Sequence, residues 1–136
     1  METRIPKSEN DKNSEIESFD SAPFNWRLIF HSSAWRPPTD VFETDEAIFV
    51  RMEVAGMREE DFNIELNGRE LIIRGIRQDA AERRAFHQME IRFGEFILSL
   101  DLPQPVNPEQ VQAVYSLGFL LLTLPKARPH QIRIKP

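Results

Sequence analysis

Three histidines and one run of acids are the side chains best suited to acid–base or metal chemistry. His31, His87 and His130 lie in three separate segments, and none has clustered carboxylates nearby at the spacing of a metal site. The acidic run at residues 59–61 could supply paired carboxylates, but consecutive acids are typical of a solvated turn or of the first turn of a short helix. We therefore expect no catalytic and no metal-binding residue.

Other signatures of catalysis are also missing from the sequence. It has no Gly-rich phosphate loop, no Gly-x-Ser-x-Gly elbow and no His-Glu-x-x-His sequence. It has no cysteine, which excludes disulfides and thiolate chemistry and is consistent with a reducing cytoplasm. Arg83, Arg84 and Arg92 could bind an anion, although charges on a loop and an edge strand also discourage unplanned strand pairing. The sequence thus predicts a protein that is not an enzyme and needs no cofactor.

Length and composition indicate one domain with flexible ends. The chain has 136 residues, of which 40% are hydrophobic, enough for a packed core. Its net charge of -5 makes nucleic acid a poor partner. The longest aliphatic run, at residues 119–122, is far shorter than the ~18 residues of a membrane-spanning helix, and residues 1–20 hold no apolar run of signal-peptide length. We therefore expect a cytoplasmic protein without a membrane span.

The N-terminal arm, residues 1–34, has a polar part and an aromatic part. Residues 1–18 have too few apolar side chains to offset the entropy of ordering them, which predicts disorder. In the aromatic part, Trp26, Ile29 and Phe30 could form one stripe of a helix docked on the core; the alternative is an arm that stays available to partners. The apolar residues in this region are Phe19, Phe24, Trp26, Leu28, Ile29, Phe30 and Trp35.

After the prolines at positions 37 and 38, the hydrophobic pattern changes to the two-residue period of half-buried strands. This alternation extends over residues 48–54, 62–66, 96–102 and 111–115. With six to eight short strands and no strong amphipathic helix between them, the predicted fold class is all-β, an immunoglobulin-like sandwich.

Glycines mark the predicted turns. Asn67-Gly68 tolerates positive φ at both residues and predicts a type I′ hairpin between strands near 61–67 and 69–77. Ser116-Leu117-Gly118 predicts a second hairpin turn. The glycines expected to shape turns are Gly56, Gly68, Gly94 and Gly118.

The C-terminal tail, residues 127–136, is expected to be extended because prolines at 129 and 136 deny it a place in a central strand. Ile132 and Ile134 lie on one face of such a chain. They could enter two adjacent pockets at a sheet edge while the backbone adds hydrogen bonds. A last strand of the same domain or a frayed terminus are the alternatives.

Together these segments resemble the small heat-shock proteins, which are built on the α-crystallin domain. The resemblance covers about residues 35–136, and Ile132-Arg133-Ile134 matches the family's C-terminal Ile-x-Ile anchor. Leu117 stands where the family has Asn, and since leucine is disfavoured at positive φ, we expect Gly118 to form that turn alone. The matching pieces, in order, are Asp40 to Asp45, Glu53 to Met57, Glu60 to Phe62, Leu71 to Gly75, Glu90 to Phe96, Ala113 to Leu120 and Leu124 to Lys126.

The resemblance implies an ATP-independent holdase that binds partly unfolded client proteins through the aromatic arm and prevents their aggregation. It implies a sandwich at residues 35–126 whose groove, formed by Phe62, Ile64, Val111 and Ala113, receives the anchor Ile132 and Ile134 of another subunit. The alternative is a CS-type co-chaperone that binds one folded chaperone, although that resemblance does not account for the Ile-x-Ile tail.

It also implies a dimer that exchanges strands and builds a larger oligomer. The exchanged strand would pair with the partner subunit near residues 39–43, and the polar segment before it, residues 78–85, is long enough to reach. The residues of this strand are Phe86, His87, Gln88, Met89, Glu90, Ile91 and Arg92.

Overall fold

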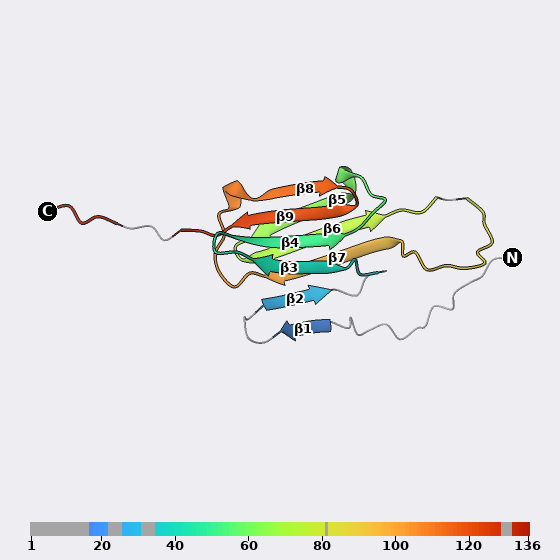
Figure 1. The fold of residues 1–136 in the computed structure, drawn as a ribbon, viewed down its shortest axis with the longest axis horizontal. Helices are drawn as coiled ribbons and strands as arrows, with labels where there is room; N and C mark the ends of the chain where they lie inside the picture. Colours follow the sequence, from blue (N-terminus) through green and yellow to red (C-terminus); the bar gives the residue numbers. More distant parts are fainter. Residues whose placement is uncertain (1–16, 22–25, 31–34, 81, 129–131) are drawn as a thin grey trace.

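The computed structural model describes residues 17–21, 26–30, 35–80, 82–128 and 132–136. The regular elements in these ranges are strands and two single 3-10 turns, which confirms the predicted all-β class. Two sheets form, in the strand orders β1-β2-β7-β6-β5 and β3-β4-β9-β8 (Figure 1). The strands are β1 (Glu17–Ser21), β2 (Trp26–Phe30), β3 (Thr39–Glu43), β4 (Ala47–Glu53), β5 (Phe62–Asn67), β6 (Glu70–Arg77), β7 (Gly94–Asp101), β8 (Gln112–Ser116) and β9 (Phe119–Pro125), and the 3-10 turns are η1 (Glu59–Asp61) and η2 (Pro108–Gln110).

The core lies between the two sheets and takes alternate residues from their strands. In β4, Ile48, Val50 and Met52 are fully buried, whereas Arg51 between them is exposed. Burying each such side chain contributes about 1.5–3 kcal/mol, so the alternation seen in the sequence is also the main source of stability. The fully buried residues of β6, β7 and β9 are Leu71, Ile73, Phe96, Leu98, Leu100, Leu122 and Leu124.

Gly75, in β6, lets an aromatic ring approach the sheet closely. It lies opposite Phe62 of β5 and Phe96 of β7. A Cβ at this position would clash with the Phe96 ring and would lie 3.1 Å from the Met57 methyl group. Glycine is therefore needed here for packing, which the sequence pattern did not indicate.

The β5–β6 hairpin has a different turn from the predicted one. Asn67 pairs with Glu70, so the two turn residues are Gly68 and Arg69. Gly68 has φ +62° and Arg69 is not in the positive region, which is the pattern of type II′ rather than type I′. The prediction of a hairpin here is confirmed, but Asn67 closes the strand instead of entering the turn.

In the β8–β9 hairpin, Leu117 itself adopts positive φ. Ser116 pairs with Phe119, so two residues must reverse the chain, and both have positive φ: 52° at Leu117 and 80° at Gly118. The prediction that Gly118 forms this turn alone is therefore wrong, because a two-residue type I′ turn requires positive φ at both positions. Gly56 and Gly94 also have positive φ, as expected for turn glycines.

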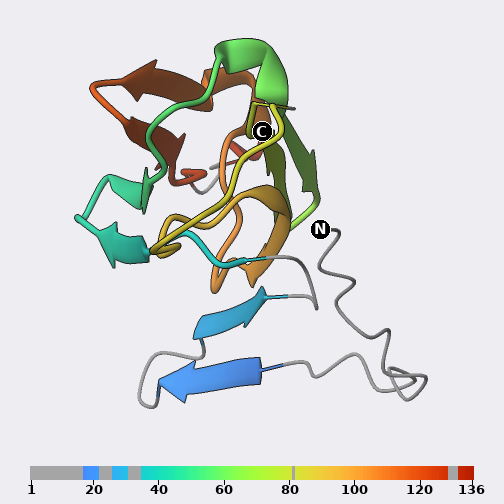
Figure 2. The ribbon, with the colours of Figure 1, turned by 90° about the vertical axis from the view of Figure 1, so that its right-hand side faces the viewer.

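The aromatic part of the N-terminal arm contains strands, not a helix. β1 and β2 form an antiparallel hairpin, and β2 pairs with β7 of the sandwich, Leu28 opposite Leu100 and Phe30 opposite Leu98. Figure 2 shows this hairpin extending one sheet beyond the other. The predicted helical stripe is wrong because the edge of β7 offers backbone partners that a docked helix would leave unsatisfied. Residues 17 and 18, expected to be disordered, belong to β1; residues 1–16 and Phe24 lie outside the described residues.

Trp35 belongs to the core and not to an exposed arm. It is buried and packs edge-on against Phe96, with ring centroids 5.5 Å apart. Its indole Nε1 donates a hydrogen bond to the carbonyl of Gly94 at 2.9 Å. Trp35 was expected in the aromatic arm that contacts clients; the structure instead places it in the core, where its ring and its polar atom have partners inside the sandwich.

Candidate functional site

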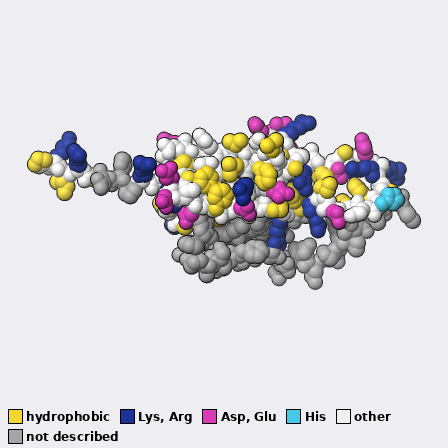
Figure 3. Space-filling view, viewed as in Figure 1, with side chains coloured by type: hydrophobic (Ala, Val, Ile, Leu, Met, Phe, Trp, Pro, Cys, Tyr) yellow, Lys and Arg dark blue, Asp and Glu magenta, His cyan; other side chains and the backbone are white. Residues whose placement is uncertain are grey.

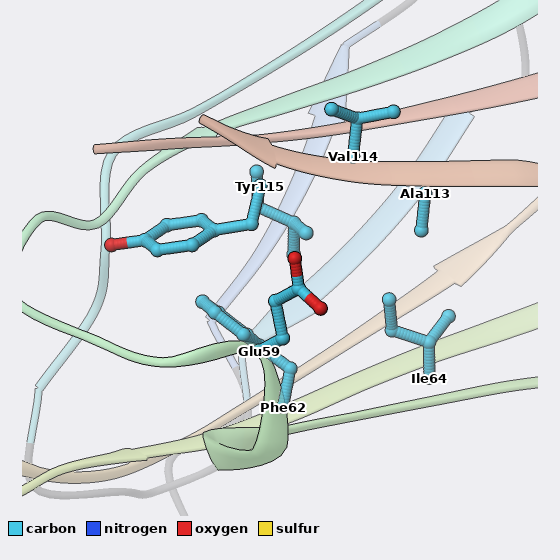
Figure 4. A pocket seen from close by; sticks show the side chains of 7 residues that line it. Glu59, Phe62, Ile64, Ala113, Val114 and Tyr115 are labelled. Atoms are coloured by element: carbon cyan, nitrogen blue, oxygen red, sulfur yellow. The ribbon is translucent and has the colours of Figure 1, made fainter. Parts of the chain in front are cut away.

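An apolar groove of about 360 Å³ opens between β5 and β8, the last strands of the two sheets. Three of the four residues predicted to line it, Phe62, Ile64 and Ala113, do so (Figure 4). Val111 does not: it precedes β8 and packs, partly buried, against the core. The complete lining is Glu59, Phe62, Ile64, Ala113, Val114, Tyr115 and Leu120.

The groove exists because two sheet edges face each other without pairing. β5 bonds only to β6 and β8 only to β9, which leaves the outer edge of each strand without a neighbour among the described strands. Such edges present free backbone donors and acceptors beside the apolar side chains. The arrangement suits an extended peptide with side chains at alternate positions.

Tyr115 fixes the shape of the groove at one end. Its hydroxyl donates to the Val54 carbonyl at 2.8 Å and accepts from the Met57 backbone N–H at 3.2 Å. Its ring lies 5.1 Å from that of Phe62, and Phe62 in turn contacts Phe96 of the core at 6.4 Å. Because the hydroxyl is satisfied and the rings are packed, this part of the groove is preformed.

Glu59 brings a charge to a groove whose other lining side chains are apolar apart from the Tyr115 hydroxyl. It lies in η1, just before β5, and Figure 4 shows its carboxylate projecting across the groove toward β8. The acidic run was predicted to be a solvated turn, and all three of its residues do lie in a surface 3-10 turn. The nearness of Glu59 to Phe62 in sequence is the signal that could have placed it at the groove. Val114, Tyr115 and Leu120 were also missed.

The predicted anchor does not occupy the groove of its own chain. Ile132 and Ile134 are 89% and 95% exposed. The C-terminal end lies well away from the sandwich, and its last residues present hydrophobic and basic side chains together (Figures 1 and 3). The same chain therefore has both an exposed groove with apolar side chains and an exposed apolar segment at its C-terminal end.

The predicted exchange strand lies in the long connection between β6 and β7. No strand forms in the described residues of 78–93, and Phe86, Met89 and Ile91 are exposed. His87 is exposed as well, whereas His31 and His130 lie outside the described residues. β3 (Thr39–Glu43), the expected acceptor, pairs only with β4 and has an open outer edge among the described strands.

An arginine holds the first part of this connection in place. Arg84 makes a 2.5 Å ion pair with Asp79, and its guanidinium lies 4.9 Å from the centroid of the Phe86 ring. The hydrogen bond from Arg84 lowers the pKa of Asp79 below its ordinary value. The ion pair is therefore charged at neutral pH, and it positions the Arg84 guanidinium next to the Phe86 ring within the same loop.

Within the described residues there is no group of three or more His, Cys, Asp or Glu side chains that could hold a metal ion. The described part of the chain also has no helix of the length and hydrophobicity needed to cross a membrane. The described residues instead offer surfaces suited to binding: an apolar groove, open sheet edges and exposed apolar segments.

Comparison with known proteins places these features in a family. The model of the "Hsp20/alpha crystallin family" matches residues 40–135. The chain is 28% identical over 120 residues to a probable 15 kDa heat shock protein of Leptospira interrogans, an alignment covering 88% of each protein. Heat shock protein 16.0 from Schizosaccharomyces pombe has a TM-score of 0.59 and 27% identity, over 73% of this chain and 75% of that one. A small heat-shock protein from Xylella fastidiosa shares the fold with a TM-score of 0.65 at 23% identity, over 76% of this chain and 99% of that one.

Proposed function

Because this chain belongs to the Hsp20/α-crystallin family of small heat-shock proteins, we propose that it is an ATP-independent holdase that binds partly unfolded proteins and keeps them from aggregating. The observation that carries this proposal is the contrast between a complete core and apolar segments left outside it. Phe86, Met89, Ile91, Ile132 and Ile134 are all exposed although the sandwich between them is tightly packed. Exposed apolar surface of this kind indicates partners.

The proposed dimer exchanges residues 86–92 between subunits. Among the described strands of one chain, none pairs with this segment or with the outer edge of β3. Pairing the two across a dimer would satisfy backbone groups on both sides, and it would bring Met89 and Ile91, which share one face of an extended strand, to the same side of the sheet. Deleting several residues between 78 and 85 removes the reach of the segment, so the variant should be a monomer by light scattering; an unchanged dimer mass at micromolar concentration would place the interface elsewhere.

The proposed oligomer forms when the tail of one subunit enters the groove of another. Two adjacent isoleucine side chains suit a groove with apolar walls at Phe62 and Ile64, and the open edges of β5 and β8 suit an extended backbone. One tail binds weakly after association costs are subtracted. Several tails in a closed assembly bind at high effective concentration, which gives a large oligomer that exchanges subunits readily.

The holdase proposal is tested by light scattering of a heat-labile protein with and without this chain, in the absence of ATP, together with the solution mass of the chain. Suppression of scattering by an oligomer is the expected result. A monomer that leaves scattering unchanged would contradict the proposal and would favour the CS-type adapter, which binds one folded chaperone.

A further inference from the structure

Glu59 carries the one carboxylate in the lining of the groove, and no described residue pairs with its charge. It is exposed and forms no ion pair among the described residues. Its neighbours in η1 are engaged: Glu60 lies 3.7 Å from the Arg58 guanidinium, and the Asp61 carboxylate accepts from the Arg58 backbone N–H at 2.8 Å. Glu59 is therefore the acid of this turn that is free to meet a ligand.

A ligand that covers the groove must also partly cover the Glu59 carboxylate, which projects across it (Figure 4). Removing a carboxylate from water without a partner is unfavourable, and a second negative charge nearby is more so. A purely apolar ligand therefore loses part of the free energy that its burial contributes, and an acidic ligand is repelled. A ligand that carries a cation beside its apolar side chains avoids both costs.

The tail of this chain has that composition. Residues 126–136 contain no acid, and their bases are Lys126, Arg128, Arg133 and Lys135 along with His130. Lys126 is already paired with Glu43 at 3.0 Å. Arg133 lies between the two isoleucines, one residue from each whichever way the tail runs, and its side chain projects from the opposite face of the extended chain, so it meets the exposed Glu59 carboxylate by reaching back over the rim of the groove. It is the cation whose distance from Glu59 depends least on that direction.

We propose that Glu59 makes the groove selective for cationic tails, with Arg133 of a second copy as its partner. This inference rests on the proposed docking of the tail and adds a charge requirement to it. The guanidinium suits a carboxylate because its donors match the two oxygens. The ion pair between Glu59 and Arg133 would distinguish tails that share the two isoleucines. A tail with an acid in place of Arg133 would be repelled by the Glu59 carboxylate.

The test uses a fluorescent peptide of residues 127–136 and the full chain carrying Ile132→Ala and Ile134→Ala, whose own tails do not compete. Anisotropy measures binding at low salt and at about 0.5 M salt, where exposed charges are largely screened. We expect Glu59→Gln to weaken binding roughly two- to fivefold at low salt and little at high salt, the range for an exposed ion pair. Glu60→Gln is the matched control, because it removes a charge of the same turn outside the groove lining.

A charge exchange makes the test specific for the two residues. The peptide with Arg133→Glu should bind the parent groove more weakly, and the Glu59→Lys chain should restore its binding, since the two single changes share one interaction. The peptide with Lys135→Glu should show little restoration. Equal binding of the parent peptide to the Glu59 and Glu60 variants, or no restoration, would overturn the charge pairing.

These results also separate the inference from the docking on which it rests. If the parent peptide fails to bind, or if a peptide with both isoleucines replaced by alanine binds as well as the parent, the tail does not dock in the groove. If the parent peptide binds through its isoleucines and ignores Glu59, the docking stands and only the selectivity is wrong. Thermal unfolding of each chain shows that the variants are folded.

Discussion

The guanidinium of Arg77 lies 4.0 Å from the centroid of the Trp35 ring, where the connection between β6 and β7 leaves the sandwich. The same side chain donates from Nε to the Arg92 carbonyl at 2.8 Å, with a second bond from Nη2, and from Nη1 to the Ala55 carbonyl at 3.2 Å. Trp35 in turn donates to Gly94. One arginine and one tryptophan thus hold both ends of residues 78–93 together.

Replacing Arg77 with Met keeps an apolar stem over Trp35 but removes the charge and its hydrogen bonds. We expect a loss of about 1–3 kcal/mol in unfolding free energy, since the cation–π contact and hydrogen bonds from a charged group contribute on this scale. Urea denaturation measures the loss. Arg83→Met, in the same connection, is the control, and an equal loss there would contradict a special role for Arg77.

Replacing Leu117 with Asn should stabilise the domain. Leu117 has φ 52°, and its side chain is 96% exposed, so the substitution relieves strain and removes no packing. The expected gain is about 0.5–1 kcal/mol in unfolding free energy, because Asn tolerates the left-handed region better than Leu. Gly118→Ala is the opposite control: it should destabilise, since φ is 80° and the new Cβ would lie 3.2 Å from the Ala55 Cβ. A less stable Leu117→Asn variant would be evidence that the leucine has a contact of its own.

The ion pair between Asp79 and Arg84 should respond to acid in a defined direction. The hydrogen bond from Arg84 lowers the pKa of Asp79 in the folded chain from 3.8, so this contribution is fully present above that value. It is lost as the pH falls through the lowered pKa. In a chain that carries His87→Gln, so that no imidazole lies beside this segment, the NMR chemical shifts of residues 79 and 84 should therefore stay constant from pH 7 to about 5 and change only in stronger acid. Asp79→Asn should give, already at pH 7, the chemical shifts that the parent shows in strong acid. A transition near pH 6 would show that the response does not come from protonation of Asp79.

Replacing Ile132 and Ile134 with Ala should dissociate the assembly without unfolding the sandwich. Both side chains are exposed in the single chain, so the domain loses no packing. Burying two isoleucines contributes about 3–6 kcal/mol to the binding of a tail, before the costs of association and ordering are subtracted. The double variant loses most of this contribution. Light scattering across a dilution series should find dimers whose thermal unfolding resembles that of the parent. Pro136→Ala serves as the tail control. A parent-sized oligomer in the double variant would show that the tail is not the anchor.

Removing the N-terminal arm should weaken protection of clients. A chain lacking residues 1–16 keeps β1 and β2, whereas one lacking residues 1–34 also loses the β2–β7 ladder. We expect the longer deletion to protect a heat-labile protein less and to unfold at a somewhat lower temperature, because the edge of β7 is uncovered. Full protection by the longer deletion would show that the arm is not needed for binding clients.

Much of this protein could be predicted from the spacing of its apolar residues. The two-residue period at 48–54 and 96–102 identifies strands and their buried faces, because successive side chains in a strand point to opposite sides whatever the neighbouring strand is. The same local signals placed hairpins at residues 67–70 and 116–119 and indicated an extended C-terminal tail. Phe62, Ile64 and Ala113 could be assigned to the groove only because the family resemblance supplied an arrangement of strands.

The remaining features depend on which strands become neighbours, and periodicity does not specify this. The run at Trp26–Phe30 fits a short helix as well as a strand, and the open edge of β7 decides for the strand because it offers backbone hydrogen bonds. Leu117 takes positive φ because the pairing of Ser116 with Phe119 leaves two residues for the turn. Glu59 reaches the groove because the edges of β5 and β8 meet across it, although those strands belong to different sheets and lie far apart in the chain.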